Sequence, residues 1–436
     1  MADRLQQRRA GVILALLGLL IVGGAVLRVL TTDALSNPPP AGGAFGYNTF
    51  VPPNTPGASY VDPVLGWTVR RLTTDHLTDD IYARNMWWNA DATKFLHLDK
   101  TINTATGAVT HTGIPSGLFA FDRGFDPVDP DVLFYFSGST VKQLTLHPDG
   151  TMTDTIYYTA PATLKSLGGS INWLDVSGHY MVLRYGVEPS VHLFDRQNLL
   201  LGPYANAVSG TEVEAGAYIG LTPDGAFIVG GRRSWRINHS TRAVAASGTY
   251  YWDLCGDHGS FVSASDGRNY KVTSNCSDLN EFWRVDITND AESIQHNAAA
   301  QKVLPHNQRL LSVPSWSFAQ HVSTVAKGPF RDWAFCSTED VTDRFNGGVT
   351  PWLPYKSEIV GVNVLTGEVR RLVQHRSRSV DGDYGNQPRV SSSWGGELVG
   401  FASNFNQRGV IDTFAIPFAV VPPTATTAAV KLRVTP

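Results

Sequence analysis

The sequence predicts an all-β protein, a seven-bladed β-propeller with an N-terminal transmembrane helix. Three observations support this prediction: the composition, a hairpin unit that recurs along the chain, and an uncharged run near the N-terminus. The 436 residues include 41 Gly, 25 Pro and 11 Trp but only 4 Met, which suits short strands and many turns rather than a helical bundle. Charged residues make up 17% and the formal net charge is -3, so no excess of basic side chains is available to bind nucleic acid.

The recurring unit is a strand, a polar turn and a second strand. It occurs seven times, at residues 87–98, 125–136, 171–185, 219–231, 257–272, 321–337 and 387–403. Asp-Gly, Gly-Gly and Pro-Asp-Gly turns between apolar residues are the expected hairpin chemistry. Propeller blades repeat at about 40 to 50 residues, and the longer spacing of the last two units implies inserted loops. Seven blades are therefore predicted, with six or eight as alternative counts.

The ends of the repeated region predict how the ring closes. WTVRRLTT near residue 67 and VIDTFAIPF near residue 410 could share one blade. A shared blade would remove the exposed sheet edges that otherwise invite aggregation.

The N-terminus predicts the topology. Residues 11–27 are uncharged and just long enough to span a bilayer as a helix, which takes roughly 17 to 25 residues. Arg4, Arg8 and Arg9 precede this run and should stay cytoplasmic, so residues 1–30 are interpreted as a cytoplasmic stub and signal anchor. The protein is then a single-pass protein of the cell membrane with an extracytoplasmic propeller. A cleaved signal peptide is the alternative.

The remaining boundaries follow from composition. Residues 31–63 are rich in Pro and Gly and are interpreted as a linker, residues 64–420 as the propeller, and residues 421–436 as a tail. Cys255 and Cys276 could pair in an oxidising compartment and leave Cys336 buried and reduced, or all three could be isolated buried thiols.

Five polar residues lie where the innermost strands of neighbouring blades should begin. These are His258, His321, Gln387 and Arg389, with His375 on the loop that precedes the last unit. Imidazole and amide groups that converge can bind a divalent metal or an anionic ligand. Alternatively, these groups bond to neighbouring blades and line a wet channel that has no specific ligand.

The aromatic side chains also have two interpretations. Exposed aromatics on loops would favour stacking against sugars, whereas buried ones would fill the wedges between blades. The residues concerned are Trp87, Trp88, Trp316, Trp352 and Trp394.

Several of these segments carry a family resemblance. DHGSFVSASDG, HVSTVAKGPFRDWAFCS, EIVGVNVLTGEVRRLVQHRSR and QPRVSSSWGGELVGFASN resemble the second half of oligogalacturonate-lyase-like propellers, which are relatives of the TolB-type repeat family. FDPVDPDVLFYF resembles a blade signature of the same group. The resemblance implies a seven-bladed propeller in which a metal, held by His and Gln, binds a uronate carboxylate. A histidine base, with a nearby arginine, then breaks the glycosidic bond by β-elimination.

By position, His258 resembles the catalytic base of that family and Arg232 or Arg233 its arginine. His321 and Gln387 resemble two of its metal ligands, so a divalent ion such as Mn or Ca is implied if the lyase-like site is functional, and no cofactor is predicted otherwise. The family pattern places two further histidines shortly after the glutamine, whereas this sequence has Val390 and Ser392 there. Valine cannot ligate a metal and serine is a weak ligand. His375 and Arg389 remain as candidate ligand-binding residues.

Three functions are therefore weighed. The preferred one is a membrane-anchored binding or interaction module for a glycan or protein partner. If the protein is an enzyme, the resemblance implies a polysaccharide lyase that acts on uronate-containing oligosaccharides by metal-assisted β-elimination. The third is a structural component of a cell-surface assembly.

The uncharged run leads to a prediction about topology. Full-length protein should sediment with membranes, resist carbonate extraction and be protected from protease added on the cytoplasmic side. Recovery of a soluble mature chain that begins near residue 31 would show instead that a signal peptide had been removed.

Overall fold

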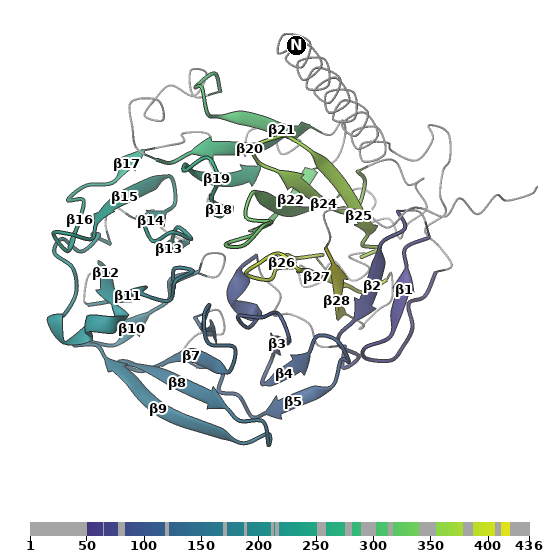
Figure 1. Cartoon of the computed structure of the whole chain (residues 1–436), viewed down its shortest axis with the longest axis horizontal. Coiled ribbons are helices and arrows are strands. Elements are labelled where there is room, and N and C mark those ends of the chain that lie inside the picture. The colour runs from purple at the N-terminus through teal and green to yellow at the C-terminus, as the bar shows by residue number, and fades with distance from the viewer. Residues whose placement is uncertain are drawn as a thin grey trace, which may run out of the picture.

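The computed structural model is a ring of antiparallel β-sheets arranged around one axis (Figure 1). It describes residues 50–63, 65–76, 83–117, 122–168, 172–186, 190–210, 213, 218–250, 259–274, 281–288, 302–312, 317–339, 355–377, 387–405 and 411–418. The seven sheets correspond one to one to the seven predicted hairpin units. The prediction of an all-β, seven-bladed propeller is confirmed.

Blades 1 to 4 follow each other along the first half of the chain. Blade 1 comprises the 3-10 helix η1 (Asn85–Trp87), β3 (Lys94–His97), β4 (Lys100–Asn103) and β5 (Val109–Thr112). Blade 2 comprises β6 (Gly124–Phe125), β7 (Val132–Ser137), β8 (Thr140–Leu146) and β9 (Met152–Thr159). Blade 3 comprises β10 (Leu164–Lys165), β11 (Tyr180–Tyr185) and β12 (Ser190–Asp195), followed by the 3-10 helix η2 (Arg196–Leu201). Blade 4 comprises β13 (Ile219–Leu221), β14 (Phe227–Gly230), β15 (Arg233–Asn238), β16 (Ala243–Val244) and β17 (Thr249–Tyr250).

Blades 5 to 7 complete the ring. Blade 5 comprises β18 (Ser260–Ser263), β19 (Asn269–Ser274), β20 (Glu281–Asp286) and β21 (Gln308–Ser312). Blade 6 comprises β22 (Ser317–Thr324), β23 (Trp333–Glu339), β24 (Glu358–Asn363) and β25 (Val369–Gln374). Blade 7 comprises β26 (Val390–Ser392), β27 (Leu398–Ser403), β28 (Asp412–Pro417), β2 (Thr68–Arg71) and β1 (Ser59–Val61), in the spatial order β26-β27-β28-β2-β1.

Blade 7 joins the two ends of the described chain. Strand β2 pairs with β28 through Arg70 opposite Ala415 and Arg71 opposite Phe414, so the predicted closure is correct. Strand β1 lies within the segment interpreted as a linker, and the propeller therefore begins before residue 64. The Pro- and Gly-rich composition around this three-residue strand concealed it. Residues 50–54 also belong to the fold, because Phe50 packs against an apolar cluster and Val51, Pro52 and Asn54 line a pocket described below.

The large aromatic side chains lie inside the ring. Trp87, Trp88 and Trp394 are at most 1% exposed, which supports packing rather than exposed stacking platforms. Trp316 and Trp352 lie outside the described residues. Cys336 is also fully buried, and burial raises the pKa of its thiol, which keeps it protonated. Cys255 and Cys276 lie outside the described residues, so their pairing stays a prediction.

Asn85 of η1 connects blades that are far apart in the sequence. Its amide nitrogen lies 2.9 Å from Thr324 O of blade 6 and 3.0 Å from Ser392 O of blade 7, and its backbone nitrogen donates to Asn172 Oδ1 of blade 3. Met86, the next residue, is completely buried in the main apolar cluster. A helical turn of blade 1 is therefore hydrogen-bonded to blades 3, 6 and 7.

The seven turns that follow the innermost strands are bonded into a circle, and we call this end of the ring the lower face. Each turn contacts the neighbouring blade through at least one hydrogen bond or ion pair. The pairs, in order around the ring, are Asn89 with Pro130, Asp126 with Arg196, Val176 with Pro223, Asp224 with Ser263, Ser265 with Asp332, Ala326 with Trp394, and Trp394 with Trp88.

The opposite end, at which the innermost strands begin, is called the upper face. It carries the segments that lead into each blade and the turns between second and third strands. None of the helices among the described residues is long and apolar enough to cross a membrane. Residues 11–27 lie outside the described part of the chain, so the anchor stays a prediction.

The shared blade predicts a cooperative effect of truncation. A domain that begins at residue 76 loses β1 and β2, with the buried side chains of Tyr60, Trp67, Val69 and Leu72. Each buried apolar side chain contributes about 1.5 to 3 kcal/mol, so the unfolding midpoint should fall by more than about 10 °C in a single transition. Scanning calorimetry against a domain that begins at residue 50 provides the comparison. An unchanged midpoint would mean that these strands do not close the ring.

Candidate functional site

The upper face brings together three of the residues selected from the sequence. His321 lies in β22, the innermost strand of blade 6, and is 2% exposed. Gln387 and Arg389 immediately precede β26, the innermost strand of blade 7. Strands β22 and β26 are neighbours, since Ser323 Oγ lies 3.1 Å from Ser392 Oγ. The predicted convergence of His321 and Gln387 on adjacent innermost strands is therefore compatible with the fold.

The two candidate catalytic arginines lie on the same face in blade 4. Arg232 lies in the turn between β14 and β15, Arg233 opens β15, and both are half-buried. The Arg233 guanidinium lies 4.0 Å from the centre of the Tyr250 ring. Lys271 of blade 5 is nearly fully buried and donates to Gly231 O at 3.2 Å, a contact that the sequence did not predict because Lys271 lies in the middle of a strand. His258 lies outside the described residues, so its role stays a prediction.

His375 connects blades 6 and 7 through hydrogen bonds. It follows β25 and is 2% exposed. Its Nε2 lies 3.0 Å from Thr338 O, and its Nδ1 accepts from the Ser377 backbone nitrogen at 3.0 Å. The carbonyl oxygen of His375 also accepts from Ser403 Oγ. Both ring nitrogens are thus held by the protein, and a ligand-binding role would require these bonds to break.

The two positions that depart from the family pattern, Val390 and Ser392, are buried in the interior. The Val390 side chain is fully buried in an apolar cluster with Phe401 and Phe414. The Ser392 hydroxyl donates to Thr324 O at 3.0 Å and lies 3.1 Å from Asn85 Nδ2. Within the described residues, no group of three His, Cys, Asp or Glu side chains is arranged to hold a metal ion.

A buried basic cluster lies where blades 1, 2 and 3 begin. Arg84 is 2% exposed, stacks on Trp87 at 5.1 Å and donates to Arg123 O at 2.9 Å. Burial lowers the pKa of Arg84 to about 10, opposed by the nearby Asp122 carboxylate. Burial likewise raises the pKa of Asp122 to about 6, although hydrogen bonds and the charges of Arg84 and Arg184 favour its ionised form. The cluster is therefore predominantly positive.

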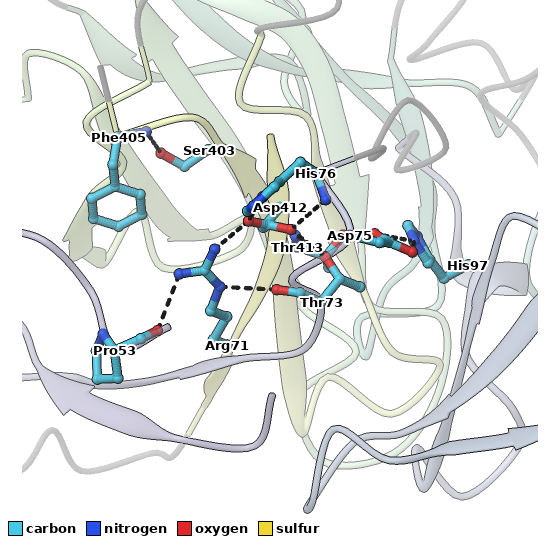
Figure 2. A network of polar contacts seen from close by, with 10 residues as sticks. All are labelled: Pro53, Arg71, Thr73, Asp75, His76, His97, Ser403, Phe405, Asp412 and Thr413. Atoms are coloured by element: carbon cyan, nitrogen blue, oxygen red, sulfur yellow. Dashed lines mark hydrogen bonds and ion pairs between the residues drawn. The ribbon is translucent and has the colours of Figure 1, made fainter. Parts of the chain in front are cut away.

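A second polar network lies at the ring closure and is centred on Asp412 (Figure 2). Asp412 opens β28, is fully buried, and forms an ion pair with Arg71 of β2. Its Oδ1 accepts from Thr73 Oγ1 at 3.1 Å and from the His76 backbone nitrogen at 3.2 Å. Its Oδ2 also lies 2.9 Å from His76 Nδ1. One carboxylate thus links the last strand to the segment that leads into blade 1.

This network borders a pocket of about 170 Å³, which we call the closure pocket. Its walls include Val51, Pro52, Asn54, His76, Phe405 and Asp412. Beside it, His97 Nε2 lies 3.0 Å from both carboxylate oxygens of Asp75 (Figure 2). This hydrogen bond, together with the charges of His97 and Lys100, holds the pKa of Asp75 well below its usual range despite partial burial.

Of the comparisons with known proteins, the search of solved structures supports the fold. No family model matches the sequence, and no curated protein is similar to it. Oligogalacturonate lyase from Vibrio parahaemolyticus superposes with a TM-score of 0.50 at 14% identity, over 84% of this chain and 97% of that chain. TolB from Acinetobacter baumannii gives a TM-score of 0.35 at 14% identity, over 64% of this chain and 60% of that chain. The resemblance stated from the sequence is confirmed at the level of the fold.

The pKa of Asp122 leads to a prediction about stability. Because the folded state raises this pKa to about 6, the carboxyl contributes stability below about pH 4, and this contribution is lost as the pH rises through 6. Asp122→Asn should therefore be more stable than the wild type at pH 7.5, by about 1 to 3 kcal/mol, and about equal to it at pH 4. Urea unfolding at the two pH values measures the difference.

The control is Asp99→Asn, because Asp99 is exposed and substitutions of exposed residues usually change the free energy of unfolding little. If the wild type were instead more stable than Asp122→Asn at pH 7.5, the ionised Asp122 would stabilise the basic cluster.

Proposed function

We propose that this protein is a membrane-anchored, extracytoplasmic propeller whose upper face binds an acidic glycan without cleaving it. The observation that carries the proposal is the group of basic side chains at the upper face, in the segments that lead into the innermost strands and in one turn between outer strands. Arg84 and Arg123 lie in the buried cluster, Arg389 precedes β26, and Arg232 lies on the turn of blade 4. Guanidinium groups on one face suit the carboxylates or sulfates of an acidic polysaccharide.

Binding without cleavage is preferred because β-elimination needs a firmly bound cation, and the candidate ligands for one are few. Loss of a proton next to a carboxylate places a second negative charge on the same group, which a bound cation must relieve. His321 and Gln387 are the two candidate ligands, and two protein donors hold a catalytic metal poorly against water. The side chains of Val390 and Ser392 take part in interior packing instead. A divalent ion at this place would therefore bind weakly.

The lyase remains the second candidate, since the fold matches that of an oligogalacturonate lyase, His321 lies in an innermost strand and Gln387 precedes the neighbouring one. In that case a metal bound there would withdraw charge from the substrate carboxylate, with His258 as base and Arg232 or Arg233 beside it. A protein partner or a structural role in a cell-surface assembly becomes the preferred function if no glycan binds.

The proposal predicts binding that depends on charge. The purified ectodomain should bind polygalacturonate or another acidic polysaccharide and should not bind neutral dextran. Its affinity for the acidic polysaccharide should decrease as the salt concentration increases. Arg232→Gln should reduce the affinity about fivefold, the loss expected for one charge-assisted contact. Arg331→Gln is the matched control, because Arg331 is exposed in a turn of the lower face. Isothermal titration calorimetry measures the affinities, and equal losses in both variants would contradict the assignment to the upper face.

The same ectodomain distinguishes binding from catalysis. We expect little tightly bound divalent metal by elemental analysis and no unsaturated uronates by ultraviolet absorbance. Stoichiometric metal that is lost in His321→Ala, together with unsaturated product that disappears in His258→Ala, would establish the lyase instead.

A further inference from the structure

The closure pocket has functional groups that the proposed function does not use. It lies at the end of blade 7, where residues 50–54, the segment after β2 and the end of β27 meet. We propose that this pocket binds a single neutral sugar ring, with His76 Nε2 as the acceptor for one of its hydroxyl groups. This site is separate from the basic cluster and does not depend on it.

The charges that border the pocket are already neutralised. Arg71 donates through Nε to Thr73 O at 2.9 Å, through Nη1 to Pro53 O at 3.1 Å and through Nη2 to Asp412. Each of its nitrogens therefore has a partner, and Arg71 has little capacity left for an anion. The carboxylate of Asp412 accepts from Arg71, from Thr73 and twice from His76, which leaves little capacity for a metal cation. The pocket thus favours a neutral ligand.

The hydrogen bond to Asp412 determines which nitrogen of His76 remains available. Because the carboxylate only accepts, neutral His76 donates through Nδ1 and keeps the lone pair on Nε2. Nε2 has no hydrogen-bond partner among the described residues, and the side chain is 38% exposed. The Asn54 side chain is also exposed at the pocket and makes no hydrogen bond there within the described part of the chain. An acceptor and an amide therefore face the same space.

The remaining walls are apolar. Val51 and Pro52 lie on one side, and Phe405 and Phe414 contribute aromatic surface. A pyranose ring carries hydroxyl groups at its edge and C–H groups on its faces, which matches polar groups set in an apolar wall. The volume of about 170 Å³ is below the roughly 300 to 1,000 Å³ of a drug-sized ligand site. It suits one ring, such as a monosaccharide or a chain end.

Two wall residues have unusual backbone conformations. His76 has φ 60° and Phe405 has φ 46°, both in the left-handed region that is unfavourable for residues other than glycine. A bulky aromatic residue is rare there. Such strain persists where the surrounding structure holds it, and it is concentrated at binding and catalytic sites. The two strained residues fix the imidazole and the aromatic wall of the same pocket.

The test uses the methyl glycosides of glucose, galactose and mannose as neutral probes, with galacturonate and inorganic phosphate as charged probes. Saturation-transfer NMR on the ectodomain should show binding of at least one neutral glycoside, with a dissociation constant on the order of a millimolar. His76→Phe keeps a flat aromatic ring at this position and removes the Nε2 acceptor together with the Nδ1 donor to Asp412, so the affinity should fall about tenfold or more. His179→Phe is the matched control, because His179 is exposed on the lower face.

Asn54→Ala supplies a second variant that should fold normally, and it should weaken binding several-fold. Arg232→Gln should leave monosaccharide binding unchanged, which separates this site from the upper-face site. The proposal is overturned if no neutral glycoside binds, if only the charged probes bind, or if His76→Phe binds as the wild type does. Should His76→Phe fail to fold, unchanged affinity in Asn54→Ala would overturn it equally.

Discussion

The ring depends on one buried carboxylate. Asp412 accepts from Arg71, Thr73 and His76, and these three residues lie more than 330 positions away in the sequence. A charge taken fully out of water is costly unless it is paired, so removing Arg71 would leave Asp412 uncompensated at a cost of about 3 to 5 kcal/mol. The pair therefore stabilises only the closed arrangement, in which β2 lies beside β28. The upper face and the closure pocket both depend on this closure.

Much of the fold could be predicted because its signals are local. Asp-Gly and related turns lie between apolar strands, and each predicted unit corresponds to one blade. The closure was predictable because two apolar segments at the ends lacked partners. Asn85 carries no such signal, since its bonds to Thr324 and Ser392 join residues whose separation in sequence exceeds 230. A single asparagine before an aromatic pair looks like any loop residue.

The candidate site was predictable only in part. Position within a repeat predicted that His321 and Gln387 lie at or just before neighbouring innermost strands, since equivalent positions of adjacent blades lie side by side. Arg84 and Asp122 were missed because burial of a charge depends on packing among three blades, which no local pattern records. His76 was missed because its significance comes from Asp412 at the other end of the chain. Charged residues in loops are usually solvated, and the sequence gives no reason to treat these differently.

The short register between β2 and β28 has a mechanical consequence. The ladder pairs only Arg70 and Arg71 with β28, while β27 and β28 pair over six positions. Beyond the ladder, Leu72 N donates to Thr413 O. A pulling force applied to the chain ahead of residue 50 would reach β1 first and then this two-residue seam. The seam would part before the pairing of β27 with β28, because its ladder is shorter. Tension on the N-terminal side would therefore open the molecule at blade 7 and at the pocket beside it. Tension spread over the other blades would be resisted by the circle of lower-face contacts.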